Sequence, residues 1–279
     1  MERRQFGATK REVAVIGQGT WYIESGGRAS AVAALRRGLD LGMTHIDTAE
    51  MYGAAEELIA EAIAGRREEV FLVSKVLPHH ASRHGTMVAC DGSLSRLKTD
   101  RLDCYLLHWR GDYPLEETFE AFQQLQRDGK ILSWGVSNFD TPDLEECWQI
   151  VGDRPFVCNQ VLYHLQERAI EHAVTPWCET HGVAVVGYAP FGHGYFPSAR
   201  TKGGRVLGEI AEAHNVTARQ VALRFLIRHP STFTIPKASS PEHAEENARA
   251  GDIRLTEAEL ARIDEAFLLG PRPRELPVL

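Results

Sequence analysis

The stretch Thr44-His-Ile-Asp-Thr-Ala-Glu-Met-Tyr-Gly53 decides more about this fold than any other part of the sequence. An apolar approach leads to Asp47, and Tyr52 follows five residues later, just before a glycine that lets the chain turn. Apolar residues then recur at helical spacing over 56–64, and Gly65 marks the end of that pattern. We therefore expect Asp47 at the end of a strand and Tyr52 on the loop that leads into a helix.

An acid and a phenol on one strand-to-helix loop indicate proton-transfer chemistry. A phenol with a pKa of about 10 donates its proton poorly at neutral pH unless a nearby cation stabilises the phenolate. If Asp47 and Tyr52 serve catalysis, another part of the chain should bring a cation beside the tyrosine.

Apolar runs typical of strands alternate with amphipathic helical patterns along the whole chain. The clearest run, 70–76, is apolar and β-branched, as expected for a strand buried on both faces. Alternation of this kind predicts a parallel sheet. Eight such runs without a linker predict one α/β domain over residues 1–279, a (β/α)8 TIM barrel. The strands are expected over 15–21, up to Asp47, and over 70–76, 102–108, 131–137, 156–161, 183–188 and 232–235.

The first forty residues add three expectations. A β-hairpin over 4–15, turned by Gly7-Ala-Thr-Lys10, is expected to close the N-terminal face, or bottom, of the barrel. Ser30 is expected to cap a helix that runs to Leu41. The segment Gly17-Gln-Gly19-Thr-Trp-Tyr22 lacks the third glycine of a dinucleotide-binding fingerprint, which argues against an open, doubly wound sheet.

The composition argues against several classes of protein. The net charge is −7 with acids and bases interspersed, and no basic block predicts nucleic-acid binding. No apolar run approaches about 18 residues, so no membrane span is expected, and no signal-peptide core follows the first residues. The five scattered cysteines indicate reduced, buried thiols rather than a disulfide framework or a zinc site. We expect a cytoplasmic monomer without a metal.

Three ionisable residues stand at the ends of consecutive predicted strands: Asp47, Lys75 and His108. A buried Lys75 needs a counter-charge, and Asp47 supplies it. The pair places a cation beside Tyr52, which favours phenolate and lowers the tyrosine pKa toward working pH. His108 can hydrogen-bond a substrate oxygen. The set suits a carbonyl that receives a proton on oxygen while hydride arrives at carbon.

Each of these residues also has a plain structural interpretation. A single lysine at a strand end is usually a solvated rim residue, a single aspartate a helix cap, and a single histidine a satisfied core residue. Together, at successive strand ends and beside one tyrosine, they favour the catalytic interpretation.

Eight short motifs follow one another along the chain: Ile46-Asp-Thr-Ala49, Met51-Tyr-Gly53, Val73-Ser-Lys75, Leu106-Leu-His-Trp109, Gly135-Val-Ser-Asn-Phe139, Cys158-Asn-Gln160, Gly187-Tyr-Ala-Pro190 and Ile235-Pro-Lys237. Over nearly the whole chain, from about Gly17 to Asn247, these motifs resemble those of the aldo-keto reductases in order and spacing. The resemblance implies that Asp47, Tyr52, Lys75 and His108 form the catalytic tetrad, with the tyrosine as proton donor and NADPH as hydride source.

The resemblance also assigns binding residues. Ser137, Asn138 and Gln160 are expected to hold the nicotinamide carboxamide, Tyr188 to stack under the ring, and Lys237 to take the adenosine 2′-phosphate. Seen alone, Asn138 would be a turn residue and Tyr188 a core residue. Glu246 and Asn247 match an adenine-contacting pair. Further cofactor contacts are expected from Gly19, Thr20, Asp47, Pro190, Phe191, Ser239 and His243, and substrate contacts from Trp21, Tyr52, His108 and Trp109.

Two residues and the C-terminal tail depart from the family pattern. His243 stands where an arginine usually follows Lys237, which weakens the expected preference for NADPH and leaves NADH possible. Arg110 replaces the proline of the usual His-Trp-Pro. The tail after Phe267 is short and predicts a more open pocket.

These observations predict a small bacterial-type aldehyde or ketone reductase, an NADP-dependent enzyme of the alcohol dehydrogenase type acting on CH–OH donors and small carbonyl substrates. The alternative is a cofactor-sensing, non-catalytic regulatory subunit of the same fold. An unrelated barrel hydrolase would need a second carboxylate or a metal set that the sequence does not offer.

Overall fold

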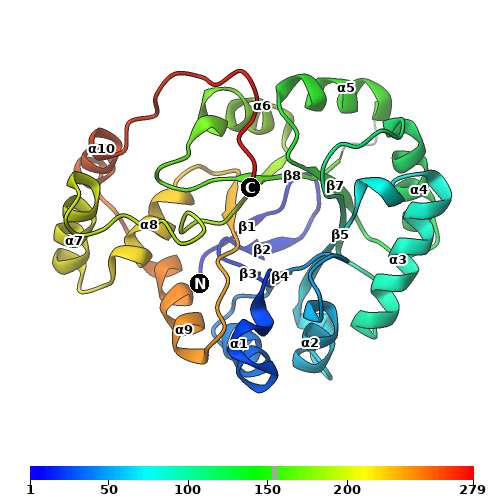
Figure 1. The fold of residues 1–279 in the computed structure, drawn as a ribbon, viewed down its shortest axis with the longest axis horizontal. Helices are drawn as coiled ribbons and strands as arrows, with labels where there is room; N and C mark the ends of the chain where they lie inside the picture. The colour runs from blue at the N-terminus through cyan, green and yellow to red at the C-terminus, as the bar shows by residue number, and fades with distance from the viewer. Residues whose placement is uncertain (153–155) are drawn as a thin grey trace.

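Eight parallel strands form one sheet in sequence order, in a computed structural model that describes residues 1–152 and 156–279 (Figure 1). Parallel bridges from Ile16 to Thr234 and from Gly19 to Lys237 join the first strand to the last. The predicted barrel is therefore confirmed. Its strands are β3 (Gln18–Gly19), β4 (His45–Asp47), β5 (Phe71–Val76), β6 (Cys104–Leu107), β7 (Trp134–Ser137), β8 (Cys158–Leu162), β9 (Ala184–Tyr188) and β10 (Thr232–Thr234).

Helices surround the strands as an outer ring (Figure 1). The α-helices are α1 (Arg28–Asp40), α2 (Ala55–Ala62), α3 (Arg83–Leu97), α4 (Leu115–Arg127), α5 (Thr141–Val151), α6 (Val174–His181), α7 (Lys202–His214), α8 (Ala218–Leu226), α9 (Pro241–Arg249) and α10 (Glu257–Ala266). Short 3-10 helices cover Ile23–Gly26, Arg67–Glu69, Pro78–His80, Ala169–His172 and Ala250–Asp252. No helix in the described part of the chain is long and apolar enough to cross a membrane.

One predicted helix start is wrong. Helix α1 begins before Ser30, with Gly27 at the N-cap, and the Ser30 hydroxyl instead donates to the backbone oxygen of Ser239. That bond ties α1 to the chain just before α9. The capping contact expected from local sequence gives way here to a contact between distant segments.

The strands alternate between two buried layers, as the period of two in a strand requires. On β5, Phe71 and Val73 pack in the barrel interior, whereas Leu72 and Val76 pack against the surrounding helices. Both layers are fully enclosed, which explains the continuous apolar run. All five cysteines are buried and free, as predicted.

The N-terminal hairpin closes the bottom of the barrel, as predicted. Strands β1 (Arg3–Gln5) and β2 (Glu12–Ala14) pair antiparallel. Just after β1, Phe6 is fully buried, with its ring centroid 4.8 Å from that of Phe71 and 5.0 Å from that of Phe233. The hairpin thus seals the interior with an aromatic plug.

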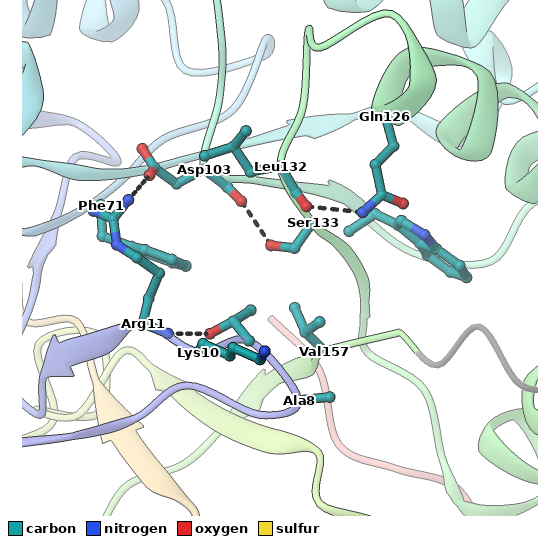
Figure 2. Close-up of a pocket in the computed structure, with 11 residues that line it drawn as sticks. Ala8, Lys10, Arg11, Phe71, Asp103, Gln126, Leu132, Ser133 and Val157 are labelled. Carbon is teal, nitrogen blue, oxygen red and sulfur yellow. Dashed lines mark hydrogen bonds and ion pairs between the residues drawn. The ribbon is translucent and has the colours of Figure 1, made fainter.

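A buried carboxylate anchors this closed end. Asp103 is 2% exposed and accepts hydrogen bonds from Arg67 over 2.8 Å and from the Leu72 backbone over 3.0 Å. Its second oxygen lies 3.2 Å from Arg11 of the hairpin. A cavity of about 450 Å³ lies beside this pair, between the hairpin turn and the strand starts (Figure 2). The carboxylate and its arginines tie the hairpin to the barrel.

Candidate active site

Side chains alternate between the two faces of a strand, and this alternation points the three strand-end residues into the barrel. On β5, Lys75 continues the inward face of Phe71 and Val73. On β6, Cys104 and Leu106 face inward, and His108 follows two residues later. Because parallel strands end at the same edge, Asp47, Lys75 and His108 meet at the carboxyl end of the barrel.

Asp47 and Lys75 form a buried ion pair. The Lys75 Nζ atom donates to Asp47 Oδ1 over 2.5 Å and to the Thr48 backbone oxygen over 2.7 Å. The second Asp47 oxygen accepts from Gln160 Nε2 over 2.7 Å. Burial lowers the pKa of Lys75, but Asp47 and Tyr52 more than offset this and raise the pKa above its ordinary value. Lys75 therefore stays charged at neutral pH.

Tyr52 lies against this pair, on the loop that follows β4. The Lys75 Nζ atom is 5.0 Å from the centroid of the tyrosine ring, and the hydroxyl is 3.5 Å from His108 Nε2. Burial raises the pKa of Tyr52 above its ordinary value, and Lys75 opposes that rise without cancelling it. The lowered pKa expected from the sequence is therefore wrong for the free protein, because the expectation left out the cost of burying the phenolate.

His108 is a neutral imidazole at this site. Burial, and then the charge of Lys75, lower its pKa to about 2. Its backbone amide donates to the Val76 oxygen over 3.0 Å, which fixes it at the end of β5. Its Nδ1 atom is buried and has no hydrogen-bond partner within the described residues. The ring can therefore offer a neutral donor or acceptor beside the tyrosine hydroxyl.

These groups border a cavity of about 500 Å³ at the carboxyl end of the barrel. Lys75 lies beneath it and is fully buried. Ser239, His243, Glu246 and Asn247 do not line the cavity. The predicted residues that do line it are Gly19, Thr20, Trp21, Asp47, Tyr52, His108, Trp109, Ser137, Asn138, Gln160, Tyr188, Pro190, Phe191 and Lys237.

The residues expected to hold nicotinamide form a hydrogen-bonded group among themselves. The Tyr188 hydroxyl donates to Asn138 Oδ1 over 2.9 Å, and Asn138 Nδ2 donates to the His108 backbone oxygen over 3.1 Å. Asn138 also lies 3.3 Å from the Ser137 hydroxyl. The Gln160 side chain instead donates to Asp47, and its backbone oxygen accepts from the Asn138 backbone amide over 2.8 Å.

The remaining predicted cofactor residues lie along the chain into α9. Lys237 is exposed and donates to the Ser239 hydroxyl over 2.9 Å. His243 is exposed on the first turn of α9, and its backbone amide faces the capping Ser240. Glu246 accepts a hydrogen bond from Thr217 over 2.7 Å. Of these residues, Lys237 alone lines the cavity.

Several lining residues were missed in the sequence. Among non-glycine residues of the described ranges, six have positive φ, and four of them line this cavity: the predicted Asn138 and the unexpected Tyr22, Ala189 and His193. Backbone strain of this kind gathers at functional sites. The Trp21 ring stacks on the rings of Tyr22 and His193, with centroid distances of 4.8 Å and 5.1 Å. The remaining lining residues not expected are Met51, Gly194, Ile235 and Leu279.

The short tail reaches the pocket that it was expected to leave more open. It runs from α10 over the barrel and ends near the centre of the view, shown red in Figure 1. Arg272 passes 4.0 Å from Asp140, and Leu279 reaches the lining of the cavity. The tail therefore contributes to the wall of the site, although its few residues carry no motif.

Comparisons with known proteins agree with this geometry. The model of the aldo/keto reductase family matches residues 15–267. A protein of Escherichia coli (strain K12) named methylglyoxal reductase YeaE is 46% identical over 267 residues, which are 93% of this chain and 92% of that protein. A glyoxal reductase of Bacillus subtilis (strain 168) is 33% identical over 271 residues, 95% of this chain and 94% of that protein. A solved aldo/keto reductase from Klebsiella pneumoniae in complex with NADP and acetate has a TM-score of 0.93 at 45% identity, with 99% of both chains covered. This chain belongs to the aldo/keto reductase family.

Proposed function

We propose that this protein reduces small aldehydes and ketones with NADPH, using Tyr52 as the proton donor. The observation that carries the proposal is the buried Asp47–Lys75 pair beside a tyrosine that faces a cavity. A general acid next to a fixed cation suits a reaction that places negative charge on a carbonyl oxygen. The relatives named for methylglyoxal and glyoxal reduction, and the relative solved with NADP, support the same chemistry.

The cavity offers groups that fit a nicotinamide cofactor. Tyr188 presents a ring, Ser137 a hydroxyl, and Asn138 and Gln160 each a side-chain amide. Lys237, at the cavity edge, has no carboxylate partner within the described residues and can meet a phosphate. When bound, NADPH supplies the hydride. We propose that Ser137, Asn138, Gln160 and Tyr188 orient its nicotinamide end.

Tyr52 keeps its proton at neutral pH, since the ordinary pKa of a tyrosine is well above neutral and burial raises the pKa of Tyr52 further. This suits a donor, since the proton must be present until the carbonyl oxygen acquires negative charge. As the proton moves to that oxygen, Tyr52 becomes a phenolate. Lys75 then stabilises the phenolate, and Asp47, held by Gln160, keeps the lysine charged and in place.

His108 has a different role in this proposal. With a pKa of about 2 it does not supply a proton as a cation near neutral pH. Its neutral ring, 3.5 Å from the tyrosine hydroxyl, can hydrogen-bond the carbonyl oxygen of the substrate. It would thus hold that oxygen within reach of Tyr52.

The lining favours small neutral carbonyl compounds. Among its described residues, Lys237 is the only lysine or arginine, and it stands at the cofactor end. The walls near Tyr52 are Trp21, Met51 and Trp109. Near Tyr52, no lysine or arginine among the described lining residues could bind a substrate carboxylate. Two-carbon and three-carbon dicarbonyls of the kind that name the relatives are the first substrates to test.

The test is NADPH consumption by the purified protein, followed by absorbance, with methylglyoxal and with 4-nitrobenzaldehyde. We expect turnover with at least one substrate. A control without aldehyde measures background oxidation. Tight NADPH binding without turnover of either substrate would contradict the proposal and favour a cofactor-sensing regulatory subunit.

A further inference from the structure

The loop that carries Tyr52 has few ties to the barrel. Among the described residues, the Tyr52 backbone bonds only within its own turn, since its amide donates to Ala49 and its oxygen accepts from Ala55, each over 3.0 Å. The links to β5 come earlier in the loop. The Thr48 amide donates to the Val73 oxygen over 2.9 Å, and the Thr48 oxygen accepts from Lys75. On the other side of Tyr52, Glu56 of α2 accepts from the Ser74 hydroxyl of β5 over 2.7 Å. The position of Tyr52 therefore depends on residues 48–50 before it and on Glu56 after it.

Glu50 is the last of these ties before Tyr52, and it uses both backbone and side chain. Its amide donates to the Lys75 backbone oxygen over 3.3 Å. Its Oε1 atom accepts from the Leu77 amide over 2.6 Å. The side chain is 9% exposed, so the bond to Leu77 is largely shielded from water. One residue thus holds the loop at two points of β5 and its extension, on either side of Val76.

A third contact comes from outside the barrel. His80 Nδ1 lies 3.0 Å from Glu50 Oε1 and 3.2 Å from Oε2. The His80 side chain is 45% exposed, so solvent weakens this contact. Removing His80 leaves the bond to Leu77 in place. The histidine therefore provides a matched control for the glutamate.

The end of β5 also places the other members of the tetrad. Lys75 belongs to it, and the Val76 oxygen accepts from the His108 amide. Glu50 joins the tyrosine loop to that same short segment. A shift of about 1 Å between catalytic groups can cost about a hundredfold in rate.

We infer that Glu50 is a positioning residue, which fixes Tyr52 relative to Lys75 and His108 by clamping its loop to the Leu77 amide. The inference rests on the proposed function for its effect on rate, but the clamp itself is a property of the folded protein. The clamp requires an oxygen at position 50 that accepts the hydrogen bond from the Leu77 amide, and the negative charge of the side chain is secondary. Glutamine should therefore replace glutamate, and alanine should not.

The test compares Glu50→Ala, Glu50→Gln and His80→Ala with the unmodified protein. For Glu50→Ala we expect kcat to fall about tenfold or more, with little change in KM or in NADPH affinity. The pH dependence of kcat should also move upward, because Tyr52 spends less time near Lys75. Glu50→Gln and His80→Ala should retain kcat within about threefold.

A second readout does not depend on activity. The protein is labelled with 13C at the hydroxyl-bearing carbon of tyrosine, and the Tyr52 resonance is identified by its loss in Tyr52→Phe. In Glu50→Ala this resonance should shift or broaden, and in Glu50→Gln it should not. A Tyr52 resonance and kcat both unchanged in Glu50→Ala would overturn the inference, as would an equal loss in Glu50→Gln. If the unmodified protein turns over no substrate while the resonance still responds to Glu50→Ala, the clamp stands and the proposed function fails.

Discussion

Both ends of the barrel hold a carboxylate whose side chain is 2% exposed, beside a cavity of about 450 to 500 Å³. At the amino end, Asp103 is paired with Arg11, seen in Figure 2, and with Arg67. At the carboxyl end, Asp47 is paired with Lys75 and with the amide of Gln160. Neither burial of the acid nor the size of the cavity separates the two ends.

The two ends of the barrel differ in the residues that are paired with each carboxylate. Arginine stays charged at any pH a protein meets, and its planar group suits a fixed structural pair. Lysine is a compact charge, and here it lies 5.0 Å from the ring of a tyrosine that borders the cavity. The amino end has no such proton donor among the described residues that line its cavity. A buried acid indicates proton transfer only where its cation also touches a group that can give up a proton.

The largest expected effect is at the tyrosine. Tyr52→Phe removes the proposed proton donor and should lower the rate of carbonyl reduction by about a hundredfold or more. NADPH affinity should change little, because the ring remains. Steady-state rates and cofactor titration by fluorescence measure the two quantities. Reduction at the unmodified rate would show that Tyr52 is not the donor.

The second prediction concerns the amino end. Asp103→Asn leaves Arg67 and Arg11 without their counter-charge and should lower the free energy of unfolding by about 2 kcal/mol. The rate per folded molecule should stay the same. Asp47→Asn is the matched variant, and it should reduce the rate strongly. Denaturant unfolding and activity are measured on both. A loss of activity in folded Asp103→Asn would remove the functional difference between the two ends.

The smallest expected effect is at the cofactor edge. His243→Arg should tighten NADPH by about tenfold, or about 1.4 kcal/mol, because only NADPH carries a phosphate that guanidinium grips in a bidentate pair. NADH should change little. Fluorescence quenching gives each dissociation constant. Equal tightening of both cofactors would place His243 away from the phosphate.

The sequence was sufficient for the barrel and for the meeting of Asp47, Lys75 and His108. Both follow from short-range rules, namely the alternation of strands and helices and the period of two along a strand. His193 and Leu279 were missed, because each reaches the cavity from a segment far along the chain and carries no periodic signal. A histidine between two glycines, Gly192 and Gly194, was the one available hint of a strained loop.

The direction of the Tyr52 pKa was missed for a similar reason. The charge of Lys75 can be inferred from residue type, whereas the depth at which the phenol is buried depends on the assembled loops. The Ser30 contact with Ser239 was missed for the same reason, because it joins segments that are distant in the sequence. Residue chemistry was predictable, and the balance between burial and charge required the structure.

The central claim is that Lys75 acts on the Tyr52 proton, and the most direct measurement is the pH dependence of reduction by Lys75→Met. Lys75 lowers the Tyr52 pKa in the intact protein, so its removal should raise the pH at which the rate falls and should slow reduction strongly. NADPH binding and circular dichroism confirm that the variant is folded. A pH profile that keeps its position, whatever the loss in rate, would contradict the account.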